Sequence, residues 1–172
     1  MSVIKNFFVL LGNYMPPKIN IFLYKLGGVN LGKVWIGNMC YFDTKFPKNI
    51  TIEDEVCLSF GVKLITHFDP EESINFHKIK KYQKKIVIKK GTFIGPGSII
   101  LPGVTIEKNC FVRAGSVVNK SIAENSIVEG NPAKIIAVMN TRTSKIINNV
   151  NKKNIILTDF IESNKLFYER HY

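Results

Sequence analysis

The chain has 172 residues, of which 45% are hydrophobic and 22% charged, as is usual for a globular domain. Its net charge of +11 could attract nucleic acid, but there is no basic helix with base-reading residues and no aromatic RNA-binding motif, which argues against that partner. The three cysteines are widely spaced, which argues against a disulfide framework or a zinc knuckle and favours a reducing compartment. We therefore expect one cytoplasmic domain with an appended end.

Residues 1–30 are predicted to form an N-terminal helical cap. Two short helices are expected, separated by the proline pair at positions 16–17, because proline interrupts a helix. The apolar run at 7–11 is too short to span a bilayer, and no small-residue cleavage site follows it, so no signal peptide is expected. Lysines flank the aromatic residues of this segment, so peripheral contact with a membrane is an alternative to covering the end of a solenoid.

Over residues 31–137, large aliphatic residues recur at intervals of six. The longest unbroken run is Ile88, Ile94, Ile100, Ile106, Val112 and Val118. A small or β-branched residue stands four positions after each of the first five. Neither a helix period of 3.6 nor a strand period of two gives a strict six, but short strands joined by turns do. This repeat is typical of a parallel β-helix, in which each coil buries its apolar face against the next.

The hexad pattern is interrupted over residues 68–85, a charged segment that contains His77 and a run of lysines. The interval from Ile52 to Ile88 is 36 residues, a multiple of six, so a degenerate coil is one interpretation. We favour an external loop, because long charged loops in compact domains usually mark functional sites. Residues 138–172 are expected to form a C-terminal extension, with a strand or helix packed on the coils and then a loose end.

Several segments of the chain resemble the hexapeptide-repeat acyltransferases, in the branch of the maltose, galactoside and surface-polysaccharide O-acetyltransferases. They are residues 42–43 and 47–52, Leu64-Ile65-Thr66-His67, residues 93–106 and 113–120, and Gly130-Asn131-Pro132-Ala133-Lys134. The resemblance implies an all-β fold, a left-handed parallel β-helix of hexapeptide repeats with short N-terminal helices, an external active-site loop and a C-terminal extension. The left hand comes from the resemblance alone, because general chirality rules favour right-handed crossovers. The resemblance also implies a homotrimer with active sites between neighbours.

The activity that this resemblance implies is transfer of an acetyl group from acetyl-CoA to a carbohydrate hydroxyl, in surface polysaccharide biosynthesis. A sugar hydroxyl is a poor nucleophile at neutral pH and needs a base aligned on its proton. Histidine is mostly neutral there and can accept that proton. His67, where a coil ends and the loop begins, is the candidate catalytic base, whereas His77 lies among charged residues and matches no motif.

The resemblance also implies binding residues for the two substrates. Those expected along the coenzyme are Pro96, Gly97, Ala114, Asn119, Lys120 and Lys134. Glycine lets a ligand approach the backbone closely, and a lysine ammonium suits phosphate. Related sugar enzymes place an Asn and an Asp before the histidine. Asp43 fits the acidic position and Asn38 matches the amide position loosely, so both are expected to bind the acceptor.

Three other functions were compared with this one. An N-acetyltransferase acting on an amino sugar or a nucleotide-linked amino sugar is the nearest alternative. A metal enzyme like the γ-class carbonic anhydrases needs three histidines around zinc, and only His67 and His77 lie near the coils, so no metal is expected. A non-catalytic scaffold would have no use for the histidine and lysine motifs.

Overall fold

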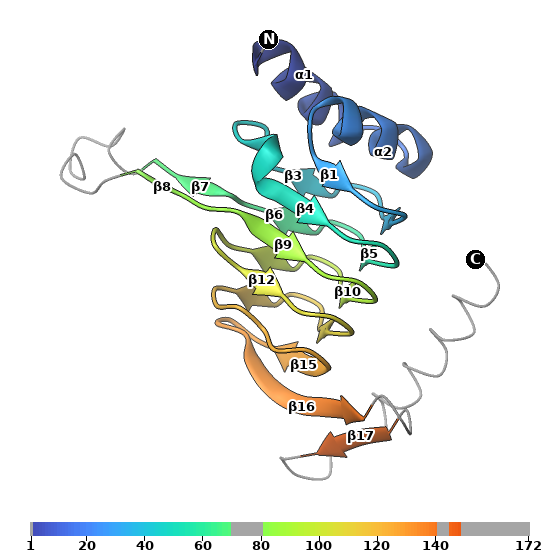
Figure 1. The fold of residues 1–172 in the computed structure, drawn as a ribbon, viewed down its shortest axis with the longest axis vertical. Coiled ribbons are helices and arrows are strands. Elements are labelled where there is room, and N and C mark those ends of the chain that lie inside the picture. The colour runs from blue at the N-terminus through green and yellow to red at the C-terminus, as the bar shows by residue number, and fades with distance from the viewer. Residues whose placement is uncertain (1, 70–80, 141–144, 149–172) are drawn as a thin grey trace.

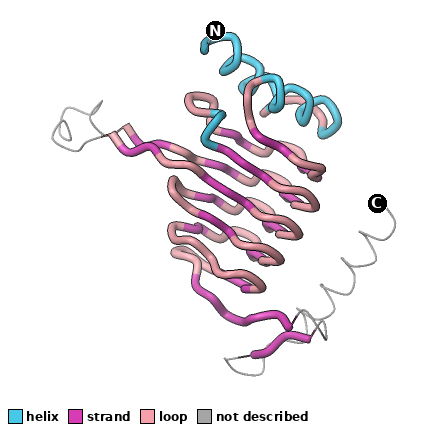
Figure 2. Tube along the Cα trace, in the orientation of Figure 1, coloured by secondary structure: helices cyan, strands magenta, loops and turns pink. Residues whose placement is uncertain are grey.

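The computed structural model describes residues 2–69, 81–140 and 145–148. In this part of the chain, short strands and turns alternate along a tapering stack of coils, and two helices cover one end of it (Figures 1 and 2). The helices are α1 (Ser2–Gly12) and α2 (Pro17–Leu26). The break between them falls at the two prolines, with Pro17 in the first turn of α2, where its missing N–H costs no hydrogen bond.

Three parallel sheets form the sides of the stack, and each successive coil adds one strand to each sheet. The first sheet holds β1 (Asn30–Leu31), β4 (Ile50–Ile52), β9 (Ile86–Ile88) and β12 (Thr105–Ile106). The second holds β2 (Trp35–Ile36), β5 (Cys57–Leu58), β10 (Phe93–Ile94), β13 (Phe111–Val112) and β15 (Ser126–Glu129). The third holds β3 (Tyr41–Phe42), β6 (Lys63–Leu64), β11 (Ile99–Ile100) and β14 (Val117–Val118). Strands that follow one another along the chain thus lie in different sheets, as the hexad pattern predicts for a parallel β-helix.

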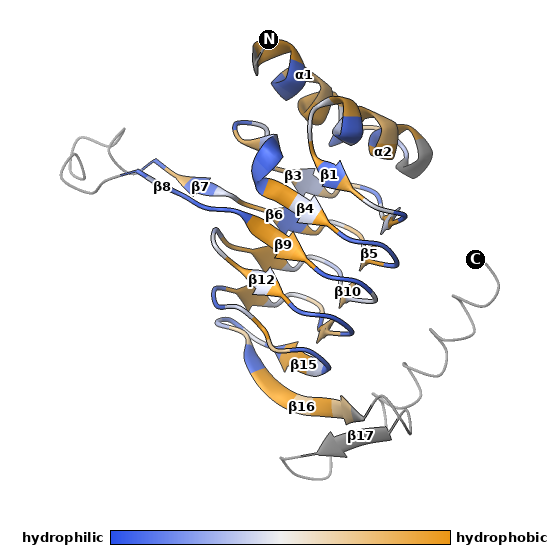
Figure 3. Ribbon diagram, viewed as in Figure 1, coloured by the Kyte–Doolittle hydropathy of each residue, from blue (hydrophilic) through white to orange (hydrophobic). Residues whose placement is uncertain are grey.

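The hexad residues stack on one another inside the coils. Ile52, Ile88 and Ile106 are register partners in the first sheet, and each is at most 1% exposed. In Figure 3, strand β9 is hydrophobic, whereas the turns on the outside of the stack are largely hydrophilic. Full burial of one such aliphatic side chain stabilises a fold by about 1.5–3 kcal/mol, so these ladders are the main source of stability.

Among the described residues, the two ends of the interruption after the second coil form a projection from the stack. The described parts of it are β7 (His67–Phe68) and β8 (Tyr82–Gln83), which pair antiparallel and lead away from the stack (Figure 1). Strand β4 pairs directly with β9, through Thr51 and Val87 among others. No extra coil fits between two strands that are already bonded, so a degenerate coil is excluded. His77 lies outside the described residues.

The last coil is followed by antiparallel strands. Strand β16 (Lys134–Asn140) pairs with β15, and β17 (Lys145–Asn148) pairs with β16. Strand β16 therefore crosses the boundary that we expected between residues 137 and 138. The remainder of the expected extension, beyond residue 148, lies outside the described residues. None of the helices in the described ranges has the length and hydrophobicity that a membrane crossing requires.

Asn13 lies between the two helices, and its side chain hydrogen-bonds to β3, the edge strand of the third sheet. Its Oδ1 accepts from the Phe42 N–H at 2.8 Å, and its Nδ2 donates to the Phe42 carbonyl at 3.2 Å. Tyr24 of α2 stacks on the Phe42 ring at 4.0 Å between centroids and donates its hydroxyl to Asn13. The amide of Asn13 thus occupies the place of a further strand and ties the helices to β3.

We expect Asn13→Ala to lower the free energy of unfolding by about 1–3 kcal/mol, because it leaves the buried N–H and C=O of Phe42 without partners. Chemical denaturation measures this change. Asn20→Ala is the matched control: Asn20 is also buried, but its Oδ1 has no hydrogen-bond partner among the described residues. A loss as large for Asn20→Ala as for Asn13→Ala would contradict the bridging role.

Candidate active site

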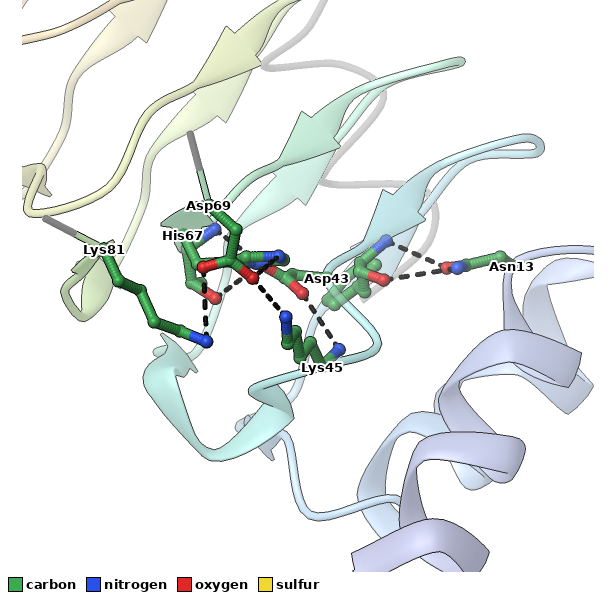
Figure 4. A network of polar contacts seen from close by, with 8 residues as sticks. Asn13, Asp43, Lys45, His67, Asp69 and Lys81 are labelled. Atoms are coloured by element: carbon green, nitrogen blue, oxygen red, sulfur yellow. Dashed lines mark hydrogen bonds and ion pairs between the residues drawn. The ribbon is translucent and has the colours of Figure 1, made fainter. Parts of the chain in front are cut away.

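His67 lies where the chain leaves the second coil, at the first residue of β7. Its side chain is 22% exposed, so it is held by neighbours while one edge stays accessible. The ring packs edge-on against Phe46, with centroids 5.2 Å apart and planes at 78°. Its Nδ1 lies 2.5 Å from Oδ2 of Asp43 (Figure 4). The structure thus orients the histidine through one ring nitrogen and leaves the other, Nε2, for a reacting group.

The Asp43 carboxylate follows β3 directly, and its side chain is only 1% exposed. Oδ2 accepts hydrogen bonds from the Thr66 N–H at 2.9 Å and the Thr66 hydroxyl at 2.6 Å, in addition to its contact with His67. Oδ1 accepts from the Lys45 N–H at 3.0 Å. Burial raises the pKa of Asp43, but the hydrogen bonds from Thr66, His67 and Lys45 outweigh it, and the net pKa lies below the ordinary value.

The position of Asp43 thus suits support of the histidine, and the expectation that it binds the acceptor stays a prediction. Both of its oxygens are occupied and almost no surface remains for a hydroxyl. An ionised carboxylate beside Nδ1 favours the tautomer that carries its proton on Nδ1, so that Nε2 presents a lone pair. It also stabilises the imidazolium that forms when Nε2 takes a proton.

Three charged residues that the sequence reading did not single out surround the accessible edge of His67. Asp69 Oδ2 lies 3.8 Å from His67 Nε2. Lys45 contacts the same carboxylate oxygen, and Lys81 lies 3.3 Å from Oδ1 (Figure 4). The hydrogen bond from Lys45 is the main reason that the pKa of Asp69 is lowered. In the sequence, the only signal for Lys45 is its position two residues after Asp43, and the only signal for Asp69 is its position two residues after His67.

The candidate coenzyme residues fall at two ends of the third sheet. Pro96, Gly97 and Ala114 lie in the turns that precede β11 and β14, where Gly115 N–H donates to the Pro96 carbonyl at 2.8 Å. We call this stack of turns the Pro96 corner. Lys134 follows a turn fixed beside it, since Ala133 N–H donates to the Val117 carbonyl at 2.8 Å.

The other two candidates, Asn119 and Lys120, directly follow β14, so they lie at the end of the third sheet from which Asp43 and His67 also project. The structure thus divides the six residues between opposite ends of these short strands. Gly97 has a φ of +67°, a backbone conformation that favours glycine. A Cβ built on it meets no atom within 4 Å, so no protein neighbour occupies the space beside it.

Asn38 lies on the Pro96 corner, where its carbonyl accepts from the Gly61 N–H at 3.0 Å. Strand β3 separates it from Asp43, so the two lie at opposite ends of the third sheet. The structure does not bring Asn38 and Asp43 together within one chain, and their expected contacts with the acceptor stay a prediction.

The cysteines offer no nucleophile. Cys40, Cys57 and Cys110 are all buried, and none of the three forms a disulfide within the described residues. Burial raises the pKa of the Cys40 and Cys110 thiols to about 11, so they stay protonated at neutral pH. Within the described ranges, no group of three or more His, Cys, Asp and Glu side chains could hold a metal ion.

Comparisons with known proteins agree with this architecture. Residues 85–120 match the family model "Bacterial transferase hexapeptide (six repeats)". Protein CapG of Staphylococcus aureus is 37% identical over 155 residues, which cover 77% of this chain and 86% of CapG. A galactoside O-acetyltransferase of Lactococcus lactis subsp. lactis (strain IL1403) is 29% identical over 174 residues, covering 94% of this chain and 77% of that protein.

Among solved structures, the fold is similar to a hexapeptide-repeat-containing acetyltransferase from Vibrio cholerae O1 biovar eltor, complexed with acetyl coenzyme A. Its TM-score is 0.55 at 20% identity, over 80% of this chain and 86% of that one. The chain belongs to the hexapeptide-repeat acyltransferase family, as its motifs indicate. The chain is an acyltransferase, as the similarity to named acetyltransferases shows.

Proposed function

We propose that the enzyme transfers an acetyl group from acetyl-CoA to a sugar hydroxyl, in the biosynthesis of a surface polysaccharide. The observation that carries this proposal is the pairing of His67 Nδ1 with the buried, ionised Asp43, which equips Nε2 as a general base. The similarity to a galactoside O-acetyltransferase supports a sugar acceptor, and the acetyl-CoA complex of a structure with the same fold supports the donor. From the family we also infer that the coils are left-handed.

In the proposed reaction, both substrates bind together and no acyl-enzyme forms. Nε2 of His67 takes the proton of the sugar hydroxyl while the hydroxyl oxygen attacks the thioester carbonyl carbon. The carbon–sulfur bond then breaks, the acetyl ester remains on the sugar, and the imidazolium returns the proton to the departing thiolate. Asp43 stabilises the imidazolium between these two steps. The burial of all three thiols agrees with direct transfer.

The accessible side of His67 suggests how the acceptor is held. Asp69 is a carboxylate near Nε2, and Lys45 and Lys81 fix its position. A carboxylate can accept hydrogen bonds from sugar hydroxyls. We infer that Asp69 makes the acceptor contact that we had expected of Asp43, because the Asp69 side chain is 8% exposed, against 1% for Asp43, and its partners are exposed lysines.

A thiol-release assay tests the proposed function. The enzyme is incubated with acetyl-CoA and a panel of free sugars, sugar phosphates, nucleotide sugars and amino sugars, and free coenzyme A is measured. We expect release that depends on acceptors carrying only hydroxyl groups. Release with amines alone would establish the N-acetyltransferase alternative instead.

We expect Lys134→Glu to raise the KM for acetyl-CoA about tenfold or more while kcat changes little, because it places a negative charge beside the coenzyme phosphates. Steady-state kinetics with varied acetyl-CoA measures both constants. Lys108→Glu is the matched control, since it makes the same charge change at another exposed lysine. An unchanged KM for Lys134→Glu would remove Lys134 from the coenzyme site.

The division of the candidate residues favours a homotrimer. In one chain the Pro96 corner and His67 lie at opposite ends of the third sheet. We infer that the Pro96 corner of a neighbouring protomer completes the site. A closed ring of heterologous contacts would give each protomer the same neighbour. We expect sedimentation equilibrium to give the mass of three chains. A stable monomer at micromolar concentration would contradict the shared site.

A further inference from the structure

A cavity of about 340 Å³ lies between the helical cap and the coils, and its wall includes Phe46, which packs against His67. Its lining includes three lysines and three side-chain amides: Lys5, Lys45, Lys48, Asn6, Asn49 and Gln83. No carboxylate is among the described residues that line it. This volume lies at the lower end of the range for small-molecule sites.

The cavity shares two residues with the candidate active site. Phe46 forms part of its wall and packs against the His67 ring at 5.2 Å between centroids. Lys45 lines it and contacts Asp69, whose Oδ2 is 3.8 Å from His67 Nε2. The Phe46 side chain therefore stands between the cavity and the His67 ring, and Lys45 and Asp69 link the cavity to the side of Nε2.

The cations of the cavity come from separate parts of the chain and converge. Lys5 belongs to α1, and Lys48 belongs to the short 3-10 helix η1 (Pro47–Asn49). A Cβ built on Gly28 would lie 3.6 Å from Cγ of Lys48 and 3.9 Å from Cδ of Lys5, so the two side chains run over the same glycine. Lys45 is paired with Asp69, but neither Lys5 nor Lys48 forms an ion pair within the described residues.

We propose that the acceptor is a sugar carrying a phosphate or diphosphate, which binds in this cavity while a hydroxyl of the sugar reaches His67. This inference rests on the proposed function. Two lysines whose side chains run over the same glycine bring positive charge to one partly enclosed site, and this charge favours an anion there. Lysine binds phosphate as a point charge, and the amides of Asn6, Asn49 and Gln83 supply further N–H donors.

The test compares one sugar in three forms: free, as its 1-phosphate and as its nucleotide diphosphate. The series is run for glucose, galactose and N-acetylglucosamine. Acetyl transfer is measured for the wild type, the double variant Lys5→Gln/Lys48→Gln and the control Lys108→Gln. We expect the wild type to prefer phosphorylated forms, and the double variant to lose about ten- to a hundredfold in kcat/KM for them. The free sugar should change less, and the control should match the wild type.

Equal kcat/KM for free and phosphorylated sugars, or a preference that survives in the double variant, would overturn the inference while leaving the proposed function intact. Absence of transfer to any hydroxyl acceptor would instead overturn the proposed function. The 1-phosphate and nucleotide arms separate the two sources: equal activity identifies a single phosphate as sufficient, and activity with the nucleotide form alone identifies a diphosphate.

Calorimetric titration with inorganic pyrophosphate provides a readout that does not depend on transfer. Saturating coenzyme A first occupies the phosphate contacts of the coenzyme. We expect the wild type and Lys108→Gln to bind pyrophosphate under this condition, and the double variant to bind about tenfold more weakly or worse. Equal binding by the double variant and the wild type would place the anion elsewhere, and thermal unfolding of each variant verifies that it is folded.

Discussion

His67→Ala is expected to lower kcat by about a hundred- to ten-thousand-fold, the usual cost of removing a positioned general base. The side chain is partly exposed and lies at the root of the projection rather than in the hexad ladders, so the folded state should survive its removal. Coenzyme affinity and oligomeric state should stay close to wild type. Single-turnover acetyl transfer, with coenzyme binding measured by calorimetry, separates the loss of chemistry from a loss of binding.

His77→Ala is the control for this experiment, since it removes the same side chain at a position that lies among charged residues and matches no family motif. It should change activity little. A structural role for His67 would give the opposite pattern, with impaired stability and residual activity in proportion to folded protein. Retention by His67→Ala of more than about a tenth of the wild-type turnover would remove His67 as the base.

Asp43→Asn is expected to reduce kcat by about a hundred- to ten-thousand-fold, while preserving shape and most of the hydrogen bonding. An amide facing Nδ1 can donate its own N–H to that nitrogen, which favours the tautomer protonated on Nε2. That tautomer cannot accept the proton of the acceptor hydroxyl. The KM for acetyl-CoA should change little, since Asp43 is buried beside the histidine and does not face the coenzyme. If Asp43→Asn raised the KM for the acceptor and left kcat unchanged, Asp43 would instead bind the acceptor.

The same variant should also change how the stability of the fold depends on pH. The folded-state pKa of Asp43 lies below its unfolded value, so the ionised carboxylate stabilises the fold above the unfolded pKa, at about 3.9. This contribution is lost as the pH falls through the folded pKa. Asp43→Asn should therefore lose more stability at pH 7 than at pH 3, compared with the wild type.

The coils could be predicted from the sequence because a single rule acts at every turn of the chain. A position that faces inward, such as Ile88 or Ile94, must be apolar wherever the coil is regular, and burial there is complete. The 18-residue interval between Ile88 and its partner Ile106 repeats that rule without exception. The departure of β7 and β8 from the coils could be predicted for the opposite reason, because the lysines and acids of this segment cannot enter such a core.

The role of Asp43 could not be predicted, because the first coil is irregular. Its register partners Ile36 and Leu58 are 22 residues apart, not 18, and the additional residues include the η1 turn. Without that offset, the sequence does not reveal that Asp43 projects beside Thr66 and His67 or that Asn38 occupies another corner. The bridge through Asn13 is likewise a contact between distant segments, and no periodicity marks it.

The identity of the product formed from 13C-acetyl-CoA tests most directly whether the enzyme acetylates a sugar hydroxyl by direct transfer at His67. NMR of the purified product should show an acetyl carbonyl bonded to a sugar oxygen, and mild hydroxylamine should release it as expected for an ester. His67→Ala should form this product at a rate reduced in proportion to its kcat, and the protein itself should carry no label. Label recovered as an amide on an amino sugar, or as an acetyl group bound to the enzyme, would contradict direct O-acetylation.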